Sequence, residues 1–408
     1  MRQILFPGDE QFWYETLRSF SHIAYGGADF GEVAAITGRI TEGDYDSWYD
    51  AWLAAAERLA AEAGDALRAG HRASARDGLL RASDYYRSAE FFLHGHPGDP
   101  RHYHAYARSV GCFRAAAELF TPPVQPVSIP YEDTTLPGYL YRVDDSGVAR
   151  PTLVMHHGFD GPAEELHFQG AAAAVERGYT VLTFDGPGHP GPRHHQGLVF
   201  RPDWENVVSP VVDFARTLPE VDGGQIALLG TSFGGLLAPR AAAFEHRLAA
   251  VIAVDGVYDM SLTVRAGVGD DPDLERRLRA EDDPQLDAGI IRLAAASPVM
   301  RWELDQAQWA FGAPSPRQAA AAFLDYHLRD GIAEKIACPA LICDAAGDLF
   351  FAGQARQLFD HLTSPKTFLE FTADEGADAH CHVGAQRLAL ARIINWLDDT
   401  LGAGRGEG

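Results

Sequence analysis

The chain has 408 residues, of which 46% are hydrophobic and 22% are charged, and its formal net charge is −23 at pH 7. This balance is typical of a large globular protein, and the excess of negative charge argues against nucleic acid or an anionic membrane as a partner. The N-terminal residues lack the pattern of a secretory leader and no apolar run could span a bilayer, so we expect a cytoplasmic protein without a membrane contact. The four cysteines do not have metal-ligand spacing, and neither a metal nor a disulfide framework is expected.

The first third of the chain has the pattern of helices. Residues 45–120 are rich in Ala, Arg and Glu, and apolar residues recur there with the helical period, for example over 52–60 and 73–93. Three prolines within 121–126 interrupt this pattern and indicate a linker. We therefore predict a helical N-terminal domain over residues 1–123, in which the helices pack as a bundle.

The remaining residues, 124–408, alternate between short β-rich segments and helical ones. Strands are expected at 127–130, 138–142, 152–155, 180–184, 225–229, 250–254, 340–343 and 367–371, and helices at 164–177 and 204–218 among others. The first two strands would form an antiparallel pair. The alternation that follows predicts an α/β fold with a mainly parallel sheet covered on both faces. The interval at about 258–330 is too long for a simple crossover, so we expect a lid insertion there.

The sequence Gly-Thr-Ser-Phe-Gly at 230–234 directly follows an expected strand. A strand that ends in Gly-x-Ser-x-Gly and continues as a helix is the nucleophile elbow of α/β-hydrolases, in which the serine stands in a strained turn. Glycines are needed because side chains at those positions would collide with the neighbouring strand and helix. Ser232 is therefore the candidate nucleophile.

A serine hydroxyl becomes a good nucleophile when a histidine accepts its proton and a carboxylate orients that histidine. In this fold the chain order is Ser, then Asp or Glu, then His. Asp348 follows the turn after the seventh expected strand and is our candidate carboxylate, with Asp344 as the alternative. His380 and His382 both lie after the last expected strand, and either could be the base. We favour His380, because His382 is expected to begin the terminal helix.

An oxyanion hole needs two backbone N–H donors that point at the developing charge. We expect one donor from Phe233, the residue after the nucleophile. The other is expected from Phe159, in the sequence His-His-Gly-Phe-Asp-Gly at 156–161 that follows an expected strand. His156 and His157 lack a partner at metal-ligand spacing, so we do not expect them to bind a metal.

The sequence Asp-Gly-Pro-Gly-His at 185–189 is typical of a turn, and we expect it to shape a pocket wall. His189, His194 and His195 form a group of histidines in this region. We expect them in an exposed loop, and a functional histidine cluster is the alternative.

These motifs together resemble the α/β-hydrolase family that includes 2,6-dihydroxypseudooxynicotine hydrolase and the fungal polyketide chain-shortening hydrolases. The resemblance covers nearly the whole chain, and the segments that carry it are 25–33, 47–49, 81–92, 185–188, 230–235 and 376–381. It implies a triad of Ser232, Asp348 and His380, a helical cap over the active site, a homodimer, and no metal or organic cofactor. His189 departs from the pattern, which has glutamine there in many relatives.

The resemblance also implies hydrolysis of a C–C bond beside a ketone, or of an ester. With the triad pattern, this favours a serine hydrolase that acts on a hydrophobic, carbonyl-rich small molecule such as a polyketide or an aryl ketone. Two alternatives stay open. One is elimination, cyclisation or acyl transfer in a biosynthetic pathway on the same triad, and the other is a binding module without catalysis.

Overall fold

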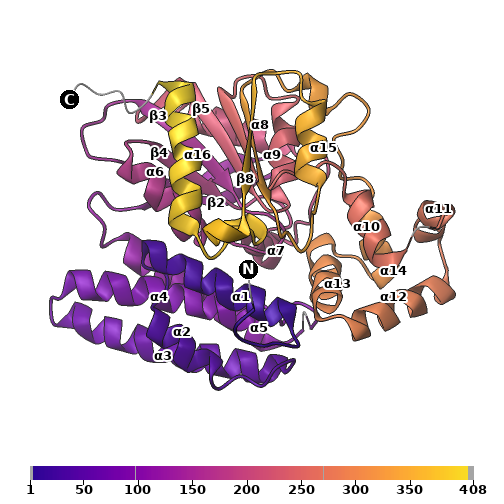
Figure 1. Cartoon of the computed structure of the whole chain (residues 1–408). Coiled ribbons are helices and arrows are strands. Elements are labelled where there is room, and N and C mark those ends of the chain that lie inside the picture. Colours follow the sequence, from indigo (N-terminus) through magenta and orange to yellow (C-terminus); the bar gives the residue numbers. More distant parts are fainter. Residues whose placement is uncertain (1–2, 97, 270, 403–408) are drawn as a thin grey trace.

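The computed structural model describes residues 3–96, 98–269 and 271–402 (Figure 1). The helices before the first strand are α1 (Glu10–Ser21), α2 (Phe30–Thr37), α3 (Tyr45–Arg68), α4 (Arg72–Glu90) and α5 (Pro100–Ala117), with the 3₁₀ turn η1 (His22–Tyr25) after α1. Trp48 and Trp52, which are one helical turn apart in α3, are both fully buried. The proposed boundary between residues 123 and 124 falls in the connection from α5 to the first strand.

A single sheet of eight strands follows within the described residues. The strands are β1 (Gln125–Tyr131), β2 (Thr134–Tyr141), β3 (Arg150–His156), β4 (Thr180–Phe184), β5 (Val221–Thr231), β6 (Ala250–Val254), β7 (Ala340–Ala345) and β8 (Lys366–Phe371). Their order in the sheet is β1-β2-β4-β3-β5-β6-β7-β8. β2 is antiparallel to β1 and β4, and all other neighbours are parallel. Every expected strand is present, and the α/β-hydrolase fold class is confirmed.

Helices cover both faces of the sheet. They are α6 (Ala172–Glu176), α7 (Pro190–Gln196), α8 (Glu205–Ala215), α9 (Gly234–Ala242), α15 (Gln354–His361) and α16 (Gln386–Leu401). In Figure 1 α16 lies in front of the strands, and α9 packs against β5 and β6. All residues of β4 and β6 are buried, as expected for strands covered on both faces. The helix expected over 164–177 is shorter than expected, because regular α-helix occupies α6 alone and the π-helical turn η2 (His167–Ala171) precedes it.

Among the described residues, the segment between β6 and β7 carries five further α-helices, and we call it the insertion. It contains α10 (Met260–Val268), α11 (Leu274–Leu278), α12 (Pro284–Ala296), α13 (Pro298–Phe311) and α14 (Pro316–Phe323). The proposed lid at about 258–330 coincides with this segment. α13 contacts α1, so the insertion and the N-terminal helices meet next to the sheet (Figure 1). No helix among the described residues is long and apolar enough to cross a lipid bilayer.

Candidate active site

Ser232 stands in a sharp turn between β5 and α9. Its φ is 61°, in the left-handed region that residues with a side chain rarely adopt. The neighbouring glycines make the turn possible: a Cβ on Gly230 would lie 2.0 Å from Gly234 O, and one on Gly235 would lie 1.7 Å from Asp255 O. The local sequence therefore places the serine in the strained turn that a nucleophile elbow requires.

His380 and Asp348 lie beside this serine. His380 Nε2 is 2.8 Å from Ser232 Oγ, and His380 Nδ1 is 2.8 Å from Asp348 Oδ2. Because an ionised carboxylate can only accept, Nδ1 carries the proton and donates to Asp348, which leaves Nε2 to accept from the serine hydroxyl. Asp348 is itself held, since its Oδ1 accepts the N–H groups of Phe350 and Phe351 at 2.7 and 3.0 Å. The structure thus brings together the three residues that we proposed from the sequence.

The two alternative candidates lie elsewhere. Asp344 is half-buried on β7, where burial and then neighbouring carboxylates raise its pKa to about 6, and no hydrogen bond among the described residues joins it to His380. His382 Nε2 lies 3.0 Å from Asp255 Oδ1 rather than beside the serine. The expectation that His382 begins the terminal helix is wrong, because it closes a 3₁₀ turn, η5 (His380–His382), and α16 starts later in the chain.

Asp255 is a residue that sequence analysis missed. It directly follows β6 and lies against residues 380–382, which we call the histidine loop. Its Oδ2 accepts the N–H of Cys381 at 2.8 Å and lies 3.4 Å from His380 Nδ1. Its Oδ1 lies 3.0 Å from His382 Nε2. Asp255 therefore holds the backbone on which the candidate base stands. Its position at the end of an expected parallel strand was the signal that could have identified it.

The surroundings of His380 determine its protonation. Burial opposes the positive charge, but the nearby groups, with Asp348 first, raise the pKa of His380 well above its usual value of 6.5. The ring is therefore a neutral base only on the alkaline side of this raised pKa. Any reaction that begins with proton transfer to His380 should lose rate as the pH falls through it.

The loop after β3, residues 157–161, carries the expected donor Phe159, and we call it the oxyanion loop. It contacts the nucleophile elbow. A Cβ on Gly158 would lie 2.7 Å from both Ser232 Cβ and Phe233 N, so the absence of a side chain at Gly158 allows the two loops to touch. Among the described residues, the N–H groups of Phe159 and Phe233 donate to no protein acceptor. Both expected oxyanion donors therefore lie on adjoining loops with their hydrogen-bonding capacity unused.

The histidines that we expected in an exposed loop differ from one another. His189 is fully buried at the start of α7, so the expectation is wrong for this residue. Its Nδ1 accepts the N–H of Gly186 at 2.7 Å, and its protonated Nε2 donates to His157 O at 3.2 Å, which supports the oxyanion loop. Burial lowers the pKa of His189 and keeps it neutral. The Pro-Gly-Pro that follows begins a helix rather than a loop, in which His194 is partly buried and His195 is exposed.

A buried group of charges joins α1 to the same loop. Arg18 Nη1 lies 2.6 Å from Asp160 Oδ2, and Arg18 Nη2 lies 2.6 Å from Glu165 Oε2. Glu165 Oε2 is also 3.2 Å from His157 Nε2. All four side chains are buried. Because an unpaired charge would be costly in this position, these contacts fix α1 against the residue that follows Phe159.

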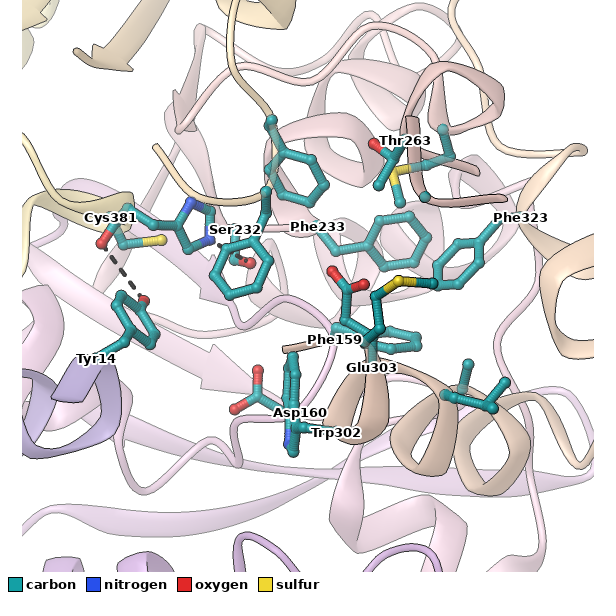
Figure 2. A pocket seen from close by; sticks show the side chains of 18 of the residues that line it. Tyr14, Phe159, Asp160, Ser232, Phe233, Thr263, Trp302, Glu303, Phe323 and Cys381 are labelled. Carbon is teal, nitrogen blue, oxygen red and sulfur yellow. Dashed lines mark hydrogen bonds between the residues drawn. The ribbon is translucent and has the colours of Figure 1, made fainter. Parts of the chain in front are cut away.

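A cavity lies next to Ser232 (Figure 2). Its wall is mostly apolar and combines residues of the oxyanion loop, the elbow and the insertion, among them Phe159, Phe233, Ile290, Met300, Trp302 and Phe323. A pocket with this lining suits a hydrophobic small molecule. The insertion therefore supplies much of the surface that such a molecule would contact.

Some buried side chains could also hold a metal ion by their spacing. The three groups among the described residues are Glu90, His94 and His102; Asp255, His380 and Cys381; and His22, Asp84 and Glu165. The second group belongs to the histidine loop, and the third is contiguous with the charges around Arg18. In the first group Glu90 Oε2 lies 3.0 and 3.2 Å from the Nε2 atoms of the two histidines.

Comparison with known proteins agrees with this geometry. A family model described as the alpha/beta hydrolase family matches residues 153–393. Hydrolase LUC6 of a Fusarium species is 36% identical, with 97% of this chain and 98% of that protein covered. 20-hydroxy-prefusarin hydrolase FUS2 of Gibberella moniliformis is 34% identical, with 95% and 96% covered.

Solved structures show the same fold at lower identity. The crystal structure of 2,6-dihydroxy-pseudo-oxynicotine hydrolase has a TM-score of 0.73 at 22% identity, with 94% of this chain and 96% of that chain covered. AbyA5 has a TM-score of 0.63 at 17% identity, with 95% and 98% covered. The family model matches more than half of the chain, and the hydrolase relatives extend over nearly all of it. The protein is an enzyme of the alpha/beta hydrolase family.

Proposed function

We propose that this enzyme is a serine hydrolase in which Ser232 is the nucleophile, His380 transfers protons and Asp348 orients the histidine. The observation that carries the proposal is the unbroken series of two 2.8 Å hydrogen bonds from Asp348 through His380 to Ser232, which ends at the wall of a mostly apolar cavity. Such a series supplies a base for the serine proton and holds that base in the required tautomer.

The proposed reaction has two stages. His380 Nε2 takes the proton of Ser232 as Oγ bonds to the substrate carbonyl carbon, and the N–H groups of Phe159 and Phe233 bind the resulting oxyanion. Each such donor lowers the barrier by about 3 kcal/mol. The intermediate then collapses, His380 returns the proton to the leaving oxygen or carbon, and the serine is left acylated. Water gives a proton to the same histidine as it attacks the acyl carbon. The bond from that carbon to Ser232 Oγ then breaks, His380 returns the proton to Oγ, and a carboxylic acid is released.

We propose that the bond cleaved is a C–C bond beside a ketone, or an ester bond, in a polyketide or aryl ketone type of molecule. The apolar wall of the cavity supports a hydrophobic substrate. C–C cleavage produces a carbanion, so such a substrate needs a second carbonyl group that holds the charge as an enolate. The names of two similar proteins state hydrolysis of 20-hydroxy-prefusarin and of 2,6-dihydroxy-pseudo-oxynicotine, which supports an organic small molecule as the substrate here.

The expected homodimer, the cytoplasmic location and the lack of a nucleic-acid partner stay predictions. Light scattering on the purified protein checks the first of them, because a dimer has twice the mass of the 44.3 kDa chain.

The experiment that tests the proposed function is product analysis by mass spectrometry in heavy-oxygen water. The substrates are p-nitrophenyl esters and aryl 1,3-diketones. The variants are Ser232→Ala and, as a control, Ser146→Ala, which removes an exposed hydroxyl. We expect label in a carboxylic acid fragment from the native enzyme and the control but not from Ser232→Ala. The panel shows whether C–O or C–C bonds break.

Turnover that persists in Ser232→Ala would contradict the proposal. Products that lack the label, formed by an enzyme whose Ser232 still reacts with a phosphonate, would indicate elimination, cyclisation or acyl transfer on the same triad instead.

A further inference from the structure

The cavity wall includes the carboxyl group of Glu303, which the proposed reaction does not use. Glu303 projects from α13 into the cavity (Figure 2), and the cavity lining includes both Glu303 and Ser232. The side chain is otherwise surrounded by protein, and the surface that it keeps faces this space. Among the described residues it makes neither a hydrogen bond nor an ion pair. The carboxyl group is therefore available to bind a molecule in the cavity.

The other carboxyl groups of the cavity wall are paired. Asp160 Oδ2 lies 2.6 Å from Arg18 Nη1, and Glu15 Oε2 lies 3.4 Å from the same nitrogen and 3.3 Å from Arg87 Nη1. These two acids belong to the buried charges on the side of the N-terminal helices. Glu303 lies on α13 of the insertion, and burial alone raises its pKa to about 7. It therefore lacks the neighbouring cation that explains the other two.

The helix that carries Glu303 is fixed in place. Gln306, one turn further along α13, donates its Nε2–H to the carbonyl of Phe159 at 2.6 Å. Trp302 stacks on Phe91 of the N-terminal region, with ring centroids 5.1 Å apart and an angle of 11° between the planes. Residues three or four positions apart share a helix face, so the bond from Gln306 also directs Glu303 toward the cavity next to the oxyanion loop. The carboxyl group is thus preorganised for a ligand that has its carbonyl at Ser232.

We propose that Glu303 accepts a hydrogen bond from a hydroxyl group of the substrate, and that the enzyme thereby selects hydroxylated, carbonyl-bearing hydrophobic molecules. The inference rests on the proposed function, because it places the substrate carbonyl at Ser232. A hydroxyl fits better than an ammonium group for two reasons. A carboxyl group keeps an acceptor oxygen whether or not it is protonated. Moving an ammonium ion into an apolar cavity would also require its dehydration, which costs far more than that of a hydroxyl.

The test measures binding, so that it does not depend on turnover. The ligands are methyl ketones in a homologous series of chain lengths, each compared with the same ketone bearing a terminal hydroxyl or a terminal amine. Calorimetry gives the dissociation constants for the native enzyme, Glu303→Leu, Glu303→Gln and the control Asp305→Asn. Asp305 is on the same helix but lines a different pocket. Thermal unfolding of each variant shows whether it is folded.

We expect the native enzyme and the control to bind the best hydroxylated ketone about tenfold to a hundredfold more tightly than its plain counterpart. Glu303→Leu should lose this preference while it still binds the plain ketone. Glu303→Gln, which keeps an acceptor oxygen, should retain part of it. Equal constants for both ketones in the native enzyme, or no binding of either, would overturn the inference. A preference for the amine that Glu303→Gln abolishes would overturn it in favour of a cationic substrate.

Phosphonate labelling of Ser232 on the same samples separates this inference from the proposed function. Labelling without hydroxyl preference would leave the serine hydrolase in place and remove the role of Glu303. Hydroxyl preference without labelling would support the binding site and remove the proposed reaction.

Discussion

The N-terminal helices and the insertion both border the cavity, but they contact the rest of the enzyme in different ways. The N-terminal side uses buried charges, with Arg18 between Asp160 and Glu165 at 2.6 Å each. The insertion uses mainly apolar side chains and has a small core of its own, formed by Val264, Leu274, Leu278, Leu286, Ile290 and Leu324.

The difference has a physical consequence. Buried ion pairs are directional and lose much energy when one partner moves, so they suit a region that must hold catalytic loops in one geometry. Apolar contacts are non-directional and tolerate changes of shape, so they suit a wall that adapts to a substrate. We therefore expect changes in the triad and on the N-terminal side to affect every substrate alike, and changes in the insertion to affect the choice of substrate.

The largest effect is expected from Asp348→Asn. The variant loses the charge that fixes the tautomer of His380, and kcat should fall by about 10⁴-fold for all substrates to the same extent. Asp344→Asn is the matched control, because Asp344 makes no hydrogen bond to His380 among the described residues, and its rate should stay near that of the native enzyme. Steady-state kinetics on several esters measures both. Equal losses in the two variants would move the orienting role to Asp344 or to a shared effect on folding.

Arg18→Met is the corresponding change on the N-terminal side. It leaves Asp160 buried without its cation and Glu165 with Arg87 alone, at 3.5 Å, so the free energy of unfolding should fall by about 3–5 kcal/mol. The oxyanion loop should loosen, and kcat should fall for every substrate. The control is Arg58→Met, which breaks the exposed ion pair with Glu62 and should cost at most about 1 kcal/mol. Denaturant titration that gave similar losses for the two variants would contradict the assigned role of the buried charges.

Gln306→Leu tests the insertion. It removes the hydrogen bond from Gln306 on α13 to the carbonyl of Phe159. This bond joins the insertion to the oxyanion loop. We expect changes of about tenfold in kcat/KM that differ between short and bulky substrates, since the cavity wall shifts while the triad stays intact. Gln308→Leu, on the same helix, serves as the control. A uniform loss across the substrate series would show that the insertion also controls the rate.

The smallest expected effect concerns the pH dependence of kcat/KM. His380 must be neutral to accept the serine proton, and Asp348 and its neighbours raise the pKa of His380 above 6.5 against the effect of burial. The acid limb of kcat/KM should therefore lie above pH 6.5, with activity lost as the pH falls. In Asp348→Asn the remaining activity should have its acid limb at lower pH. An unchanged limb in that variant would show that another group titrates.

The sequence could predict those roles that arise from local patterns, but not those that arise from contacts between distant residues. The elbow, the end of the seventh strand and the loop after the eighth are local patterns, and Ser232, Asp348 and His380 follow from them with their order in the fold. Asp255 and Arg18 were missed, because their roles arise from contacts between residues that are far apart in the chain. His189 was misplaced for the same reason, since its partner is the carbonyl of His157 on another loop.

The central claim is that the hydrogen bonds from Asp348 through His380 activate Ser232. Its most direct test is the rate of labelling by a fluorophosphonate, measured by intact mass and located by peptide mapping. We predict a single label on the peptide that contains Ser232, no label in Ser232→Ala, and labelling slowed by orders of magnitude in Asp348→Asn but not in Asp344→Asn. A label at another residue, or labelling of Ser232 at the native rate in Asp348→Asn, would contradict the account.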